Sequence, residues 1–387
     1  MAPTGKVSLF RVPTQVVYGQ GVAAEAGKRC LEFGAKRALI VTDKGVLGAG
    51  LTDGITNSLQ AAGLEYSIFS DVEANPTIAN VERCAEARRE FGAELIVGVG
   101  GGSPLDTAKA AAILATNGGK ISDYEGADKV NQSPMPLVAI ATTAGTGSEV
   151  TIFTVITDPV RRFKFTIASP RSAARLALVD PLLTMSMPPR LTAAVGMDAL
   201  THSIESVIST MSWPASQALA MESIRLIAAN LPAAVENGDS LEARDGMMMG
   251  SLLGGMCFNN TRLGPAHAMA HPLGGFFNAA HGVVNAILLP HVMEYSREYA
   301  LDKLAAIARA MGVYTRGLSA QEASKQAVEA VRTLAARIGI PKGLAAIGVN
   351  PAAIPDMARD AMTSGNIAVT PRKTRLEDLV RLYQEAM

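Results

Sequence analysis

Four short apolar runs in the first half of the chain, each separated from the next by an amphipathic stretch, constrain the fold more than any other feature. These runs are RALIVT, YSIF, ELIVGV and PLVAIA, at 37–42, 66–69, 94–99 and 136–141. Strands that alternate with helices are typical of βαβ units. Because the runs are apolar throughout, we expect both faces of each strand to be covered, as in a parallel sheet. The first half is therefore predicted to be an α/β domain with a mostly parallel sheet.

Two more β-rich runs come next, at 151–157 and 163–168. They flank the turn-forming pair Asp158-Pro159 and predict a hairpin, which we place at the edge of the same sheet. A last apolar run at 176–180 predicts the final strand of this domain.

The second half of the chain has a different pattern, which begins after the prolines at 181, 188 and 189. From Leu191 onward, apolar residues recur with helical periodicity, interrupted by glycine and proline. This pattern predicts an all-α C-terminal domain and divides the chain into domains at 1–185 and 186–387. The expected helices span 191–209, 214–236, 240–258, 281–299, 301–311 and 319–338.

The composition excludes several classes of protein. The 387 residues include 35 Lys and Arg against 35 Asp and Glu, so no excess of positive charge attracts nucleic acid or an acidic membrane surface. No run of about 18 apolar residues predicts a membrane span, and the N-terminus lacks the apolar segment of a secretory signal. The 3 cysteines form no CxxC pair, which argues against a disulfide framework and favours a reducing cytoplasm.

A glycine turn follows the third apolar run, in the segment GGGSPLDTAK at 100–109. Glycines let backbone N–H groups approach a pyrophosphate, and the positive end of the next helix faces it. Ser103 is expected to be the N-cap, with Pro104 in the first helical position and Asp106 returning a capping-box bond. Because the last glycine of the dinucleotide fingerprint is missing, a merely tight turn is the alternative to phosphate binding.

A second loop of small and hydroxyl-bearing residues, TTAGTGSE at 142–149, follows another expected strand. In open parallel sheets, ligands bind outside the carboxyl ends of the strands, where both loops are expected. Asp43 ends the first apolar run, from where a carboxylate can accept from the ribose 2′-hydroxyl of NAD and repel the 2′-phosphate of NADP. A polar turn is the alternative for Asp43, and likewise for Asn75 in NPT.

The 5 histidines all lie in the helical half. Asp198 and His202 are four residues apart, and so are His267 and His271, which places each pair on one face of a helix. With His281, they offer one carboxylate and four imidazoles. A divalent ion such as Fe²⁺ or Zn²⁺ can take three imidazoles and keep a position for a substrate oxygen, and the spacing does not choose among the four. A core histidine or a helix cap is the alternative at each position.

Five segments, taken as a set, resemble one family. They are GGGSPLDTAK, TTAGTGSE, GMDALTH, HAMAHPLGG and HGVVNAILLP, at 100–109, 142–149, 196–202, 267–275 and 281–290. The set resembles the iron-containing, or group III, alcohol dehydrogenases over nearly the whole chain. The resemblance implies a dinucleotide-binding α/β domain, a helical metal-binding domain, NAD, a divalent metal (Fe²⁺, with Zn²⁺ or another ion as the alternative) and a homodimer.

The resemblance also implies roles for individual residues. Asp198, His202, His267 and His281 correspond to the metal ligands, and His271 to a proton-relay or positioning residue beside the nicotinamide. The corresponding cofactor contacts are Asp43, Asn75, Gly101, Gly102, Ser103, Asp106, Thr142, Thr143, Thr146 and Lys164.

The expected activity is the reversible oxidation of small primary alcohols or diols to aldehydes, with hydride transfer to NAD⁺. One alternative is an enzyme that resembles glycerol dehydrogenase or dehydroquinate synthase, which share the overall plan and act on a polyol or a cyclic substrate. The unbroken ligand motifs favour the alcohol dehydrogenase. A non-catalytic nucleotide-binding or metal-sensing protein is a further alternative, but the sequence contains no added effector domain or basic helix.

Overall fold

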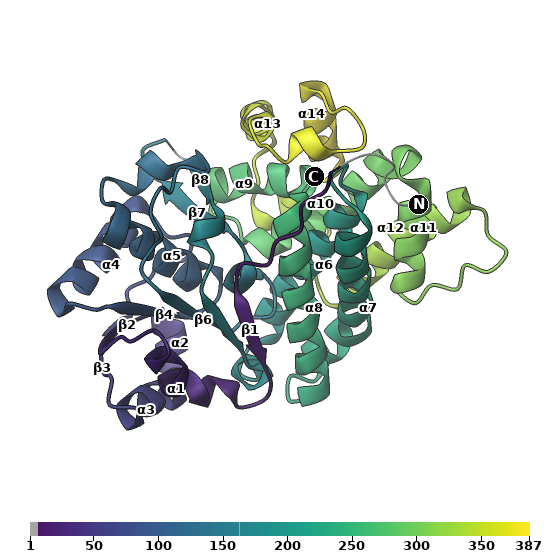
Figure 1. Ribbon diagram of the computed structural model, residues 1–387. Coiled ribbons are helices and arrows are strands. Elements are labelled where there is room, and N and C mark those ends of the chain that lie inside the picture. The colour runs from purple at the N-terminus through teal and green to yellow at the C-terminus, as the bar shows by residue number, and fades with distance from the viewer. Residues whose placement is uncertain (1–6, 162) are drawn as a thin grey trace. The chain divides into compact units, whose positions relative to one another are not determined.

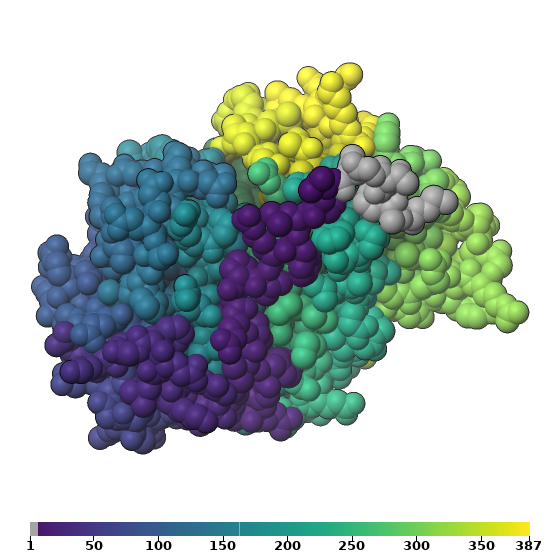
Figure 2. Space-filling model, viewed as in Figure 1, coloured from purple at the N-terminus to yellow at the C-terminus, as the bar shows by residue number. Residues whose placement is uncertain are grey.

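The computed structural model describes residues 7–161 and 163–387. They fall into two compact units: an α/β unit, Val12–Ser186, and a helical unit that joins residues 7–11 to Met187–Met387. The first residues group with the helical unit because the backbone of Arg11 is hydrogen-bonded to the side chains of Asn259 and Asn260. Figure 2 shows this N-terminal segment on the surface, where Val7 and Leu9 are exposed.

A six-stranded sheet forms the centre of the α/β unit, and all of its neighbouring strands pair in parallel. The mostly parallel sheet predicted from the apolar runs is therefore confirmed. Figure 1 shows the sheet with its helices. In spatial order its strands are β1 (Gln15–Tyr18), β9 (Leu176–Val179), β6 (Leu137–Ala141), β4 (Leu95–Gly100), β2 (Arg37–Val41) and β3 (Glu65–Phe69).

Helices cover this sheet on both faces. Helices α1 (Ala26–Leu31) and α3 (Asp53–Ala61) share one apolar core with side chains of the sheet. Helices α4 (Ile78–Phe91) and α5 (Gly102–Asn117) pack together, and both contact strands of the sheet. Their other sides contribute to a second apolar core with the hairpin. Burial on both faces explains why these strands are continuous apolar runs rather than alternating ones.

The predicted hairpin exists, but its predicted place at the edge of the large sheet is wrong. Strands β7 (Phe153–Asp158) and β8 (Phe163–Ala168) pair antiparallel and join β5 (Gly126–Ala127) in a separate three-stranded sheet. The apolar side chains of Ile156 and Phe165 pack with α4 and α5. That packing places the hairpin over the helices, whereas β1 and β3 form the edges of the large sheet.

The strand order identifies where a ligand is expected. From β2 the chain crosses to β3 on one side, while β4, β6 and β9 come in turn on the other side. Such a reversal is a topological switch point, and ligands of open α/β sheets bind outside the carboxyl ends of the strands there. Asp43 lies just after β2, and the Gly101 turn just after β4.

The helical unit contains the six helices of the expected ranges and α9, where the spacing of His267 and His271 indicated a helix without giving its bounds. Helices α13 and α14 were not predicted. Its longest helices, α6, α7 and α8, pack against one another, and a separate apolar core joins α9, α10, α13 and α14. The helices are α6 (Pro189–Ile208), α7 (Pro214–Glu236), α8 (Leu241–Thr261), α9 (Pro265–Phe277), α10 (His281–Ser296), α11 (Leu301–Ala310), α12 (Ala320–Arg337), α13 (Ile354–Met362) and α14 (Leu376–Glu385).

Short helical turns complete the described chain. One α-helical turn, α2 (Lys44–Gly48), comes after β2. The 3₁₀ turns are η1 (Val22–Glu25), η2 (Ile121–Tyr124), η3 (Ser148–Val150), η4 (Pro170–Ser172), η5 (Pro181–Thr184), η6 (Arg297–Tyr299), η7 (Leu344–Ile347), η8 (Pro351–Ala353) and η9 (Ile367–Val369).

By length and composition alone, α7 is apolar enough to cross a membrane. It packs against α6 and α8, and the inward-facing side chains of Ile224, Ile227 and Leu231 are buried. One such helix is weak evidence for a membrane span, because a core helix passes the same test.

Candidate active site

The glycine loop after β4 leads directly into α5, but the helix begins two residues earlier than the sequence predicted. Gly101 is the N-cap and Ser103 lies within the first turn, so the predicted capping role of Ser103 is wrong. Gly101 has no side chain with which to cap the helix. The first-turn N–H groups therefore remain for another acceptor, and an anion such as a pyrophosphate suits this positive end of the helix.

The second loop lies against the first. The Thr142 N–H donates to the Gly100 carbonyl over 3.0 Å. A Cβ atom built on Gly101 would lie 3.2 Å from Thr143 Oγ1, and one built on Gly102 would lie 3.0 Å from Thr146 Cγ2. These glycines thus allow the two loops to approach closely, and the structure brings together the predicted cofactor residues of both loops.

Asp106 has a different local role from the one predicted. Its two carboxylate oxygens accept hydrogen bonds from the Ser148 hydroxyl at 2.7 Å and the Val155 N–H at 2.9 Å, so the predicted capping-box bond is wrong. The buried Lys109 ammonium donates to Ser148 Oγ at 2.8 Å and to the Phe153 carbonyl at 2.9 Å. Asp106 and Lys109 therefore fasten α5 to the second loop and β7. A direct contact of Asp106 with cofactor stays a prediction.

Three other predicted cofactor residues form a chain beside the start of α5. Lys164 Nζ donates to Asn75 Oδ1 over 2.8 Å, and the Asn75 N–H donates to Ser103 Oγ over 3.3 Å. Burial lowers the pKa of the Lys164 ammonium to about 8. Residues far apart in the sequence thus place a cation near a helix N-terminus.

Asp43 is the N-cap of α2. Its Oδ1 atom accepts from the Val46 N–H at 2.9 Å. The residue therefore begins a short helix rather than a polar turn, and its contact with a ribose stays a prediction. A carboxylate has a second oxygen, so capping does not compete with a contact to a ribose hydroxyl.

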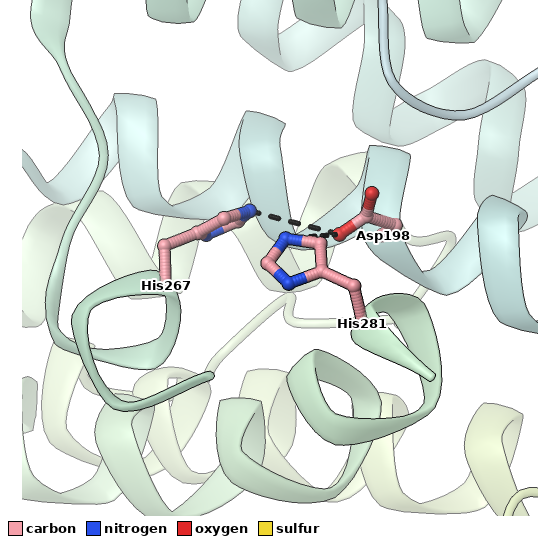
Figure 3. A group of neighbouring side chains, drawn as sticks. All are labelled: Asp198, His267 and His281. Carbon is pink, nitrogen blue, oxygen red and sulfur yellow. Dashed lines mark ion pairs between the residues drawn. The ribbon is translucent and has the colours of Figure 1, made fainter. Parts of the chain in front are cut away.

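A second cluster, in the helical unit, brings together Asp198, His267 and His281 from α6, α9 and α10 (Figure 3). Their potential ligand atoms all lie within 4.8 Å of one another. The Nε2 atoms of His267 and His281 are 3.6 Å and 3.8 Å from Asp198 Oδ1. Two imidazoles and a carboxylate converging in this way form a donor set suited to Fe²⁺ or Zn²⁺.

Close packing of α10 against α6 makes this convergence possible. A Cβ atom on Gly282 would lie 2.3 Å from the Ala194 carbonyl oxygen and 3.4 Å from Asp198 Cβ. Only glycine allows the first turn of α10 to lie at this distance from α6. The preceding residue, His281, is thereby held beside Asp198.

The electrostatics of the cluster fit a cation. Burial alone would raise the pKa of the Asp198 carboxyl, but the imidazoles of His202, His281 and His267 outweigh burial and hold it well below its usual range. Burial disfavours the charged form of His267, yet the neighbouring carboxylates of Asp198 and Glu205 raise its pKa to about 9. His267 Nε2 is buried and has no hydrogen-bond partner among the described residues. The Nε2 atom of an imidazole is a common metal ligand, so a metal ion would give this atom the partner that it lacks.

His202 and His271 lie beside the cluster without belonging to it. The His202 ring stacks on His267, with centroids 4.6 Å apart, and on Phe258, with centroids 4.4 Å apart. The His271 ring lies 5.6 Å from that of His281, centroid to centroid. The structure therefore groups three of the four predicted ligands and leaves the role of His202 as a prediction.

Two residues at the cluster were missed by sequence reasoning. Asn285 Nδ2 donates to Asp198 Oδ1 at 2.7 Å and lies 3.1 Å from His281 Nε2. Glu205 Oε2 lies 2.6 Å from His267 Nδ1. Helical spacing places Asn285 on the same face as His281, and Glu205 on the same face as Asp198. That spacing does not identify His267 as the partner of Glu205.

Comparison with known proteins identifies the family. The model of iron-containing alcohol dehydrogenases matches residues 13–181, and that of the C-terminal region of the Fe-containing alcohol dehydrogenase family matches 192–387. The chain belongs to the iron-containing alcohol dehydrogenase family. The resemblance inferred from the motifs is therefore confirmed.

Several members of the iron-containing alcohol dehydrogenase family are similar over almost their full length. A 1,3-propanediol dehydrogenase of Citrobacter freundii is 43% identical over 97% of this chain and 98% of its own. A lactaldehyde reductase of Escherichia coli K12 is 41% identical over 95% and 97%. The crystal structure of a 1,3-propanediol oxidoreductase superposes with a TM-score of 0.97, at 42% identity, over 99% of this chain and 100% of that one.

If the cluster binds a metal ion, removing a donor lowers the metal content. After loading with Zn²⁺ and gel filtration, we expect the metal content of Asp198→Ala and His281→Ala to be about one tenth of the wild-type content or less. Atomic emission spectrometry measures the content. His291→Ala, a histidine variant on the same helix as His281 but outside the cluster, is the control and should keep the wild-type content. Wild-type metal content in Asp198→Ala would contradict the assignment.

Proposed function

We propose that this chain catalyses the NAD-dependent, metal-dependent, reversible oxidation of small primary alcohols or diols to aldehydes. The observation that supports this most directly is the convergence of Asp198, His267 and His281 in a member of the iron-containing alcohol dehydrogenase family. We assign dinucleotide binding to residues 1–185 and metal binding to residues 186–387.

The proposed metal ligands are Asp198, His202, His267 and His281. Two come from α6, and the other two lie in the first turns of α9 and α10. A divalent ion held there supplies Lewis-acid polarisation of the substrate oxygen. Only one of these four side chains is a carboxylate, so a divalent ion held by them would keep a net positive charge.

The proposed cofactor cradle is formed by the two loops of the α/β unit. The N–H groups at the start of α5 bind the pyrophosphate, and Lys164, oriented by Asn75, adds a positive charge. Asp43 binds the ribose hydroxyls and so favours NAD over NADP. The remaining contacts are assigned to Gly101, Gly102, Ser103, Asp106, Thr142, Thr143 and Thr146. Asp106 also holds Ser148 and β7 in place.

In the proposed reaction, bound NAD⁺ would supply the acceptor for a hydride from the alcohol carbon, and the alcohol hydroxyl would release a proton to solvent. The products are an aldehyde, NADH and a proton. His271, whose ring neighbours that of His281, is assigned to the transfer of this proton. The cradle contributes by positioning, since correct orientation of two reactants lowers the barrier without new chemistry.

Relatives named for activities on small molecules support the substrate class. These relatives are a 1,3-propanediol dehydrogenase, a lactaldehyde reductase and, in Bacillus methanolicus, an NAD-dependent methanol dehydrogenase. A role like that of glycerol dehydrogenase or dehydroquinate synthase is therefore not favoured. We also propose a homodimer located in the cytoplasm, a compartment that fits the three free, buried cysteines.

The function is tested by measuring NADH formation after loading the protein with Fe²⁺ or Zn²⁺. We expect NAD⁺ reduction with at least one of ethanol, 1-propanol and 1,2-propanediol, and NADH oxidation with the matching aldehyde. His267→Ala is the control, because it should lose both reactions. Inactivity with every alcohol and aldehyde would refute the proposal, and activity with glycerol alone would favour the alternative.

Because Asp43 caps α2, the test of cofactor preference must keep the cap. Serine caps helices as well as aspartate does, so Asp43→Ser removes only the charge. We expect the ratio of kcat/KM with NADPH to that with NADH to rise about tenfold or more, because repulsion between unit charges a few ångströms apart exceeds about 1.4 kcal/mol. Asp53→Ser, at an exposed aspartate on α3, is the control. An unchanged ratio in Asp43→Ser would contradict the assignment.

The pKa of Lys164 predicts a pH dependence of cofactor binding. Since burial lowers this pKa to about 8, the ammonium loses its charge above that pH and attracts the anionic dinucleotide less. We expect the dissociation constant for NADH to rise about tenfold between pH 7 and pH 9. Lys164→Arg stays charged throughout this range and should flatten the profile. The same slope in this variant, measured by fluorescence titration, would exclude Lys164 as the source.

A further inference from the structure

We propose that Glu205 is a positioning residue for the metal centre, and that it holds His267 with Nδ1 protonated and Nε2 presented to the ion. The inference rests on the proposed metal site and adds a residue that does not itself bind the ion. It depends on the contacts that the Glu205 carboxylate makes with the first turn of α9.

Three N–H groups donate to this one carboxylate. Glu205 Oε2 accepts from the Gly264 N–H at 2.9 Å and lies 2.6 Å from His267 Nδ1. Glu205 Oε1 accepts from the Ala266 N–H at 2.7 Å. Gly264 is the N-cap of α9 and has no side chain to cap the helix. Glu205, from α6, therefore caps α9 and orients the histidine in its first turn.

Close approach makes this arrangement specific. A Cβ atom on Gly264 would lie 2.7 Å from Glu205 Oε1, so any other residue there would displace the carboxylate. An ionised carboxylate accepts hydrogen bonds and donates none, so it suits a position that three N–H groups face. A glutamine of the same shape would turn an NH₂ group toward at least one of them. The site thus requires a carboxylate rather than a merely polar side chain.

Glu205 acts through His267 and not on the substrate. Its side chain is fully buried, at 0% exposure. The cavity of about 10 Å³ that it borders has room for about one water molecule. With Nδ1 committed to Glu205, the lone pair that remains for a metal is on Nε2, the atom that faces Asp198 at 3.6 Å. A carboxylate behind a ligating histidine fixes its tautomer and its ring orientation.

Zinc affinity in Glu205→Gln tests the proposal without relying on activity. Removal of a hydrogen-bond partner behind a ligating histidine typically costs 10–100-fold in metal affinity, roughly the rise that we expect in the Zn²⁺ dissociation constant. Competition with a chromophoric chelator measures it. A value within about twofold of the wild type would overturn the proposal.

Asp180→Asn is the matched control, because Asp180 is also buried and accepts from three backbone N–H groups, those of Gly21, Ala23 and Leu182. It lies in the α/β unit and contacts no histidine. We expect both variants to lower the midpoint of thermal unfolding of the metal-free protein, but only Glu205→Gln to weaken zinc binding. Equal loss of zinc affinity in both would show a general effect of stability and overturn the proposal.

A crystal structure of the zinc-loaded wild-type protein provides a test that does not depend on the folding of a variant. We expect zinc on Nε2 of His267 and the contact of Nδ1 with Glu205 retained. Zinc on Nδ1 would overturn the positioning role. A wild-type chain that binds no zinc and no Fe²⁺ would instead refute the proposed metal site, which is a distinct failure.

Discussion

The buried carboxylate of Asp198 is the constraint on which the candidate metal centre depends. An ionised group without partners is too costly to bury, so the surrounding helices must supply compensating groups. In this chain α9 and α10 do so with His267 and His281, and Asn285 adds a hydrogen bond. A cation would complete the compensation. Burial of the Asp198 carboxylate is costly in the metal-free cluster, and a divalent ion bound there would lower this cost.

Much of the fold could be predicted from sequence because buried parallel strands and long helices leave strong patterns. The central strands β2, β4 and β6 begin and end within one residue of the predicted runs. Strand β1 was missed because it is four residues long and half-exposed. The hairpin β7–β8 was recognised but misplaced, since a local pattern does not say whether Ile156 and Phe165 pack on a sheet or on helices.

The candidate site was predictable where its residues share a motif and unpredictable where they meet only in space. Asp198 and His202 are four residues apart on one helix, and the convergence of Asp198, His267 and His281 agrees with the family motifs. By contrast, Glu205 is 62 positions from His267, and its role depends on the packing of α6 against α9. Helix α5 begins at Gly102, whereas capping preferences predicted Ser103 as the N-cap. Ser103 instead accepts a hydrogen bond from the Asn75 N–H.

Helix α6 presents Asp198, His202 and Glu205 at intervals of four and three residues, so all three lie on one face. One residue added or deleted between Asp198 and Glu205 would rotate the C-terminal part of the helix by about 100° around its axis. Side chains before and after the change, such as those of Asp198 and Glu205, would then face different neighbours. Substitutions near residues 198–205 are therefore tolerated in evolution where the packing allows them. Insertions and deletions within these residues are not.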